Sequence, residues 1–98
     1  MQTPTMTIDK DGIIRYSLNG RLHRLDGPAF IYPDGTQSWW LNGKYHRTDG
    51  PAIIYVDGTE EWYLNDRKYS FTDYCKQLKL PDEDIIILKL KYNTCIPA

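Results

Sequence analysis

A repeat with a period of 23 residues is the feature that most limits what this chain can fold into. Residues 18–29 read LNGRLHRLDGPA, and residues 41–52 read LNGKYHRTDGPA. The same register aligns DGT at 34–36 with DGT at 57–59, and it aligns Trp39 with Trp62. A fixed period in this range is typical of one supersecondary unit stacked on copies of itself.

Each unit predicts two short strands. Runs rich in Ile, Tyr, Trp and Phe alternate with Asn-Gly, Asp-Gly and Gly-Pro pairs, which favour turns and interrupt helices. We expect strands at residues 29–32 and 36–41, with a turn at 33–35 between them and another at 42–43. The fold class expected is mainly β (β+α): an antiparallel β-meander of tandem 23-residue hairpin repeats with a short C-terminal helical cap.

Alternation along the strands assigns the large side chains to two faces. Successive side chains of a strand point to opposite faces, so one face carries a column that we expect to be the core: Tyr16, Leu18, Trp39, Leu41, Trp62 and Leu64. The other face carries Trp40 and Tyr63. Apolar side chains on both faces predict that one face is covered and that the other can dock a partner.

The repeat fails in its third copy, where Asp66, Tyr69 and Ser70 replace the expected Gly, His and Arg. Residues 1–70 are therefore expected to form the repeat sheet, and residues 71–98 its cap. Ser70 or Thr72 can cap a helix whose apolar residues follow at helical spacing. Residues 82–91 begin with acids that favour a helix start, and they alternate in a way that also suits a strand; helix is the favoured interpretation.

Composition narrows the classes of function. Twelve Lys and Arg balance thirteen Asp and Glu, giving a net charge of −1, which does not favour binding to nucleic acid or to an anionic membrane. The sequence lacks a signal-peptide pattern and a stretch long enough to span a bilayer, so we expect a cytoplasmic protein. Cys75 and Cys95 are too few for a disulfide framework and are expected to be structural thiols.

The motif WYLN, followed by NGxxHRxDGPA and YxDGT, resembles a poorly characterised repeat family of bacteriophages, bacteria and large DNA viruses. It is similar, more distantly, to the MORN repeat, another β-hairpin unit. The resemblance covers residues 11–69, and the end of the chain resembles the short cap that often follows such arrays. It implies scaffolding or protein contact, and small phage accessory proteins of this kind often bind and inhibit a host protein, including defence systems. The HRxDGPA element departs from the MORN pattern, so lipid binding is not carried over.

The recurring polar motif is His-Arg-x-Asp, at residues 23–26 and 46–49. Imidazole can transfer protons near neutrality and a carboxylate can orient it, but a turn in which Asp accepts backbone N–H groups and pairs with His or Arg explains the same residues. The structural interpretation is favoured, because catalytic sets rarely repeat within a small array and no nucleophile accompanies the motif. We expect no enzyme activity, no cofactor and no metal site.

Two hypotheses of function remain. The first is a protein-binding module, expected to bind a host or other protein or to self-associate, with Trp40 and Tyr63 as anchors. The second is a small-ligand or nucleotide-binding protein, in which Arg24 and Arg47 hold phosphate beside His23 and His46 while an aromatic ring stacks on the base.

Overall fold

The computed structural model describes residues 2–92, which form ten short strands and two helices. The strands are β1 (Thr5–Ile8), β2 (Ile14–Leu18), β3 (Arg21–Leu22), β4 (Phe30–Ile31), β5 (Gln37–Ser38), β6 (Trp40–Leu41), β7 (Lys44–Tyr45), β8 (Ile53–Ile54), β9 (Glu60–Leu64) and β10 (Arg67–Tyr69). The helices are α1 (Phe71–Leu78) and α2 (Asp82–Tyr92). The mainly β fold and the helical cap are confirmed.

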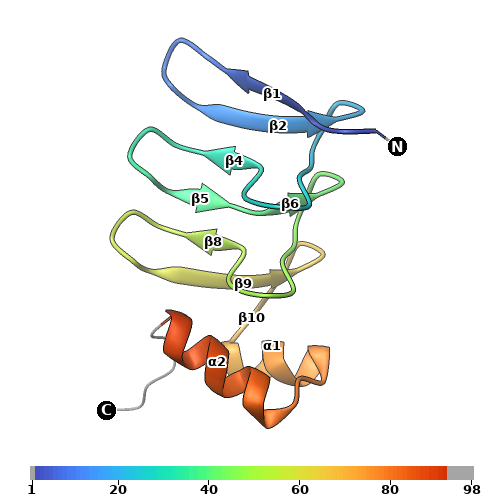
Figure 1. Ribbon diagram of the computed structural model, residues 1–98, viewed down its shortest axis with the longest axis vertical. Coiled ribbons are helices and arrows are strands. Elements are labelled where there is room, and N and C mark those ends of the chain that lie inside the picture. Colours follow the sequence, from blue (N-terminus) through green and yellow to red (C-terminus); the bar gives the residue numbers. More distant parts are fainter. Residues whose placement is uncertain (1, 93–98) are drawn as a thin grey trace.

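The strands form an antiparallel meander. The main sheet has the order β1-β2-β4-β5-β8-β9-β10, and β3 pairs with the end of β2. Strands β6 and β7 form a separate two-stranded ribbon. Figure 1 shows the hairpins stacked one below another, with both helices at the C-terminal end of the stack. The molecule is a thin slab of 42 × 31 × 19 Å.

The strand at residues 36–41 was predicted to be continuous, and this is wrong at Trp39. The segment leaves the main sheet after β5 and continues as β6, which pairs with β7. The Trp39 backbone still bonds on both sides, because its N–H donates to the carbonyl of Ala52 and its carbonyl accepts from His46 N–H. The predicted strand at 29–32 is likewise reduced to two residues.

Two kinds of turn connect the strands. At the Asp-Gly turns the backbone N–H of Thr36 or Thr59 donates to the carboxylate two residues earlier, at 2.8 and 2.9 Å. At the Asn-Gly turns both residues have positive φ, 51° at Asn42 and 79° at Gly43, which is the backbone of a type I′ hairpin. The predicted turns are therefore confirmed.

The ends of both helices carry residues that stabilise helix termini. The Ser70 side chain accepts a hydrogen bond from the backbone N–H of Asp73, and α1 ends at Lys79 with a φ of 55°. This confirms a cap at Ser70, one of the two predicted. Residues 82–92 form α2, with acids in the first turn and lysines in the last, as the helix dipole favours. None of the helices within residues 2–92 is long and apolar enough to cross a membrane.

The apolar core lies at the C-terminal end of the stack. It is formed by Trp62, Leu64, Phe71, Tyr74, Cys75 and Leu88. The predicted core column is therefore only partly correct: Trp62 and Leu64 are buried, whereas their counterparts Tyr16, Leu18, Trp39 and Leu41 are half-buried. The reason is that α1 and α2 cover only the last unit. Cys75 is buried as expected, and Cys95 lies outside the described residues.

Candidate protein-interaction surfaces

One face of the sheet carries a layer of aromatic side chains, here called the aromatic face. Its members are Phe30, Tyr32, Trp40, Tyr45, Tyr55 and Tyr63. The helices pack on Trp62 and Leu64, which flank Tyr63 on β9 and so point to the opposite side. The aromatic face is thus the one that the cap leaves uncovered.

Three of the aromatic side chains are stacked in a row that crosses strands β6, β7 and β9. The Tyr45 ring lies between Trp40, at 3.9 Å between centroids, and Tyr63, at 4.9 Å. Trp40 Nε1 donates to Ser38 Oγ at 2.8 Å, which fixes the indole against the sheet. Because the rings are held by each other, little rotamer freedom remains to be lost when a partner binds.

The aromatic face is shallow and has a polar rim. A hollow of about 160 Å³ lies among the aromatic rings, over Ser38 and Ile53. Partial burial, followed by the negative charge of Glu61, raises the pKa of Tyr63 and of Tyr55, so their hydroxyls stay protonated as hydrogen-bond donors. Glu61 also accepts from Lys68 Nζ at 3.2 Å.

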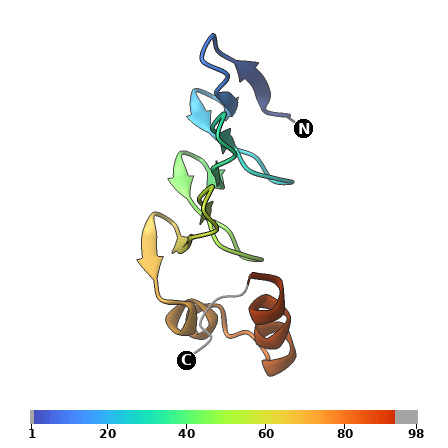
Figure 2. The ribbon, with the colours of Figure 1, turned by 90° about the vertical axis from the view of Figure 1, so that its left-hand side faces the viewer.

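The other face carries two arginine loops, at residues 24–28 and 47–51. In each loop the guanidinium lies over an aromatic ring, with Cζ 3.8 Å from the centroid: Arg24 over Tyr16, and Arg47 over Trp39. Arg24 Nε donates to Asp26 at 3.0 Å and Nη1 to the Pro28 carbonyl at 3.1 Å. Arg47 makes the same bonds to Asp49 and to the Pro51 carbonyl, at 2.9 and 3.0 Å. Figure 2 shows these loops projecting to one side of the slab, with α2 below them on that side.

The glycine of each loop lets the guanidinium close over the turn. A Cβ on Gly27 would lie 2.9 Å from Cζ of Arg24, and a Cβ on Gly50 would lie 2.7 Å from Cζ of Arg47. A side chain at either position would therefore displace the guanidinium from its place over the turn.

The two histidines connect successive hairpins. His23 Nδ1 accepts the backbone N–H of Asn42, and His46 Nδ1 accepts that of Asn65, each at 3.0 Å. Of the two partners that the sequence left open for Asp26 and Asp49, the structure has the arginines, and the histidines bond to backbone N–H groups instead. The nitrogen that faces Asn42 or Asn65 is used in a turn contact, which is a structural role.

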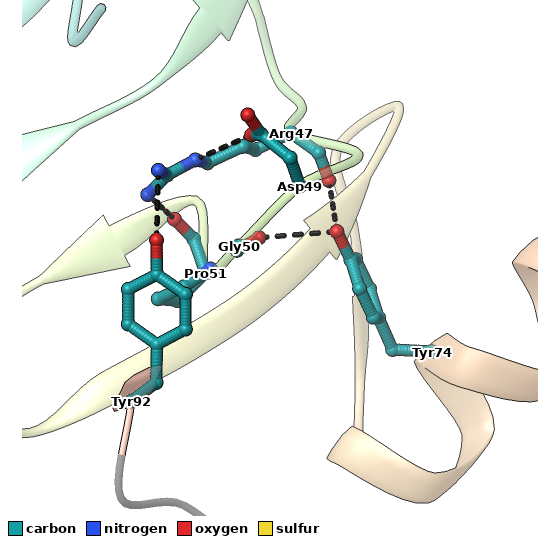
Figure 3. Close-up of polar contacts among 6 residues, drawn as sticks. All are labelled: Arg47, Asp49, Gly50, Pro51, Tyr74 and Tyr92. Carbon is teal, nitrogen blue, oxygen red and sulfur yellow. Dashed lines mark hydrogen bonds and ion pairs between the residues drawn. The ribbon is translucent and has the colours of Figure 1, made fainter. Parts of the chain in front are cut away.

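The arginine loops differ in what lies against them. The Tyr92 hydroxyl accepts from Arg47 Nη2 at 3.0 Å, and the Tyr74 hydroxyl lies beside the carbonyl oxygens of Arg47 and Gly50 (Figure 3). The Arg24 loop borders an open hollow of about 720 Å³, lined also by Trp39, Leu41, His46 and Asp49. Here this space is called the Arg24 hollow.

The predicted site residues separate into two groups. The structure brings Trp40 and Tyr63 together through Tyr45, and it places Arg24, Arg47, His23 and His46 in the loops and turns described above. Each arginine already pairs with a carboxylate, so the positive charge that a phosphate would need is largely compensated. Over residues 2–92, no three His, Cys, Asp or Glu side chains are grouped to hold a metal ion.

Sequence reasoning missed Tyr45, Tyr74 and Tyr92. Tyr45 could have been found from the Asn-Gly hairpin, because a two-residue turn places it directly opposite Trp40. Tyr74 and Tyr92 contact Arg47 across 27 and 45 residues, and no local pattern predicts such a distant contact.

Comparison of this chain with protein-family models, with curated proteins and with solved structures gives no match.

Proposed function

We propose that this chain is a protein-binding module that docks a partner on the aromatic face. The observation that supports this most is the stacked row of Trp40, Tyr45 and Tyr63 on the side that the helices do not cover. Large aromatic side chains within a polar rim are the composition of an interface hot spot.

The shape of the face favours a protein over a small ligand. Sites for small molecules are concave, with volumes of roughly 300–1,000 Å³, whereas the hollow among these rings is about 160 Å³. Tyr32 and Tyr55 are 45% and 37% exposed, so a broad apolar surface is available with almost no enclosed space. A flat protein surface buries such a layer better than a metabolite does.

The origin of the partner is proposed from the sequence. The 23-residue period and the resemblance to phage-type β-hairpin repeats favour a tandem array of the MORN-like kind, which serves as a contact surface. In that setting the partner is a host protein, including a component of anti-phage defence, and binding inhibits it in the host cytoplasm.

The test uses variants that alter exposed aromatic residues without removing the stacked row. Tyr32→Lys/Tyr55→Lys places two charges on the aromatic face, and Leu90→Lys places one on α2 at a residue that is 80% exposed. We expect wild type and Leu90→Lys to capture the same proteins from a bacterial lysate and the double variant to lose them. The amide NMR spectra of wild type, Leu90→Lys and the double variant should be equally dispersed, which shows that all three are folded. Equal recovery of every partner by the double variant would contradict the proposal.

A further inference from the structure

The Arg24 hollow is the open counterpart of a space that the cap fills one unit later. A shift of 23 positions converts Arg24, Gly27 and Pro28 into Arg47, Gly50 and Pro51. The same shift converts the floor of the hollow, Trp39 and Leu41, into Trp62 and Leu64, on which both helices pack. The filled space therefore shows which chemistry suits the open one.

Two tyrosines fill the space beside Arg47. Tyr74 is fully buried, its ring lies 4.7 Å from that of Trp62, and its hydroxyl lies between the carbonyl oxygens of Arg47 and Gly50. Tyr92 stands edge-on to Trp62 at 5.9 Å, and its hydroxyl accepts from Arg47 Nη2 (Figure 3). A phenol is thus held by an indole floor and by polar groups of the arginine loop.

The polar groups of the loop are present and unused in the Arg24 hollow, whereas the Trp39 ring already carries the Arg47 guanidinium on one side. Among residues 2–92, none donates a hydrogen bond to the carbonyl oxygen of Arg24 or of Gly27, and none accepts one from Arg24 Nη2. Trp39 and Leu41 are half-buried where Trp62 and Leu64 are buried. The Arg24 side chain is 23% exposed, against 13% for Arg47.

We propose that the Arg24 hollow binds a tyrosine side chain presented by a helix of a partner protein, in the way that the cap presents Tyr74 to the Arg47 loop. The phenol ring packs on the part of Trp39 that the Arg47 guanidinium leaves exposed, and its hydroxyl donates to the carbonyls of Arg24 and Gly27. The lower rim of the hollow carries His46, Arg47 and Asp49, where the filled space has Tyr69, Ser70 and Thr72. We expect the partner to carry a polar residue beside its tyrosine, facing this rim. This surface lies on the opposite side from the aromatic face and does not depend on it.

The binding test uses 4-methylphenol, the side chain of tyrosine, as the probe. The full ¹⁵N-labelled chain is titrated with it, and in parallel with toluene, which lacks the hydroxyl. We expect amide shifts at residues 24–27 and at the Trp39 indole, and an affinity for 4-methylphenol about 5-fold above that for toluene, the effect of one neutral hydrogen bond. Equal affinities, or shifts confined to the aromatic face, would overturn the proposal.

Two neighbouring tryptophans provide matched variants. Trp39→Leu removes the floor of the hollow and should abolish the shifts at residues 24–27, whereas Trp40→Leu alters the opposite face and should leave them unchanged. Two further outcomes count against a tyrosine: stronger shifts at the same residues with adenosine monophosphate, which would indicate a nucleotide, and concentration-dependent shifts without probe, which would indicate a second copy of the chain. The capture test on the aromatic face and the probe titration of the Arg24 hollow are independent measurements, so either proposal can be contradicted while the other stands.

Discussion

Trp39 and Trp62 occupy equivalent positions in successive units, yet they have different surroundings. Trp62 is 4% exposed and contacts Phe71, Tyr74 and Tyr92 of the cap, whereas Trp39 is half-buried under one guanidinium. The two residues share the surrounding pattern DGTxxWxLN, at residues 34–42 and 57–65. The difference teaches that the same short motif can lie at the surface or in the core, and that packing against the helices turns this surface into core.

The largest effect is expected at Trp62. Trp62→Ala should lower the free energy of unfolding by about 3–5 kcal/mol, because it removes a buried aromatic side chain and leaves a cavity. Trp39→Ala should cost about 1–3 kcal/mol, because the ring is half-exposed and loses mainly its contact with Arg47. Urea unfolding of both variants measures the difference, and equal costs would mean that the helices contribute little.

The next effect separates the two tyrosines of the cap. Tyr74→Phe should cost about 1–3 kcal/mol, because the loop carbonyls of Arg47 and Gly50 lose their buried donor. Tyr92→Phe removes a bond at the more exposed side of Arg47 and should cost about 0.5–1.5 kcal/mol. Urea unfolding again provides the measurement. A larger loss at Tyr92 would contradict the assignment of Tyr74 as the residue that holds the loop to the cap.

The histidines test whether the two units are equally important for stability. His46→Ala leaves the Asn65 N–H without its acceptor, and His23→Ala does the same to Asn42. Each change should cost about 0.5–1.5 kcal/mol, and the two costs should be alike because the geometry is the same. The midpoints of urea unfolding provide the comparison, provided that the variants unfold with the same m-value. A cost at only one of the two would show that one hairpin contact is not formed in solution.

The sequence predicts the strands, turns and cap well, because these depend on short-range chemistry. Asn42-Gly43 requires positive φ at both positions, and Ser70 supplies an acceptor for α1, so the residue types alone determine the local backbone. The β6–β7 ribbon was missed, because the break at Trp39 depends on how neighbouring hairpins pair and not on a turn residue.

The candidate surfaces were predicted only in part. Alternation correctly placed Trp40 and Tyr63 away from the core, since a period of two follows from strand geometry. It could not show that the cap would cover Trp62 and leave Trp39 open, because that depends on contacts such as Tyr92 to Arg47 across 45 residues. The sequence also left His23 and His46 open to a binding role or a structural role, and their Nδ1 contacts to backbone N–H groups support the structural one.

The smallest effect is expected at the Asp-Gly turns of residues 34–36 and 57–59, which differ in the hydrogen bond that the threonine hydroxyl makes. Thr59 donates to Asp57 with both its backbone N–H and its side chain, and these bonds hold the pKa of Asp57 below its ordinary value of 3.8. Thr36 Oγ1 instead accepts the N–H of Val56, so Asp34 receives only the backbone bond. A carboxylate with a lowered pKa stabilises the fold above the pKa of the unfolded chain, and this contribution is lost as pH falls through the folded-state pKa.

The Tm of Asp57→Asn should therefore fall less steeply than that of wild type between about pH 5 and about pH 2, the range in which aspartate side chains ordinarily titrate. The reason is that an amide does not titrate. Asp34→Asn, in the turn that lacks the hydroxyl bond, is the matched control. Because Asp57 is exposed, solvent screens its charge and the change in Tm should be only a small shift. An unchanged slope for Asp57→Asn would show that the two turns are equivalent and that the Thr59 hydroxyl bond does not persist in water.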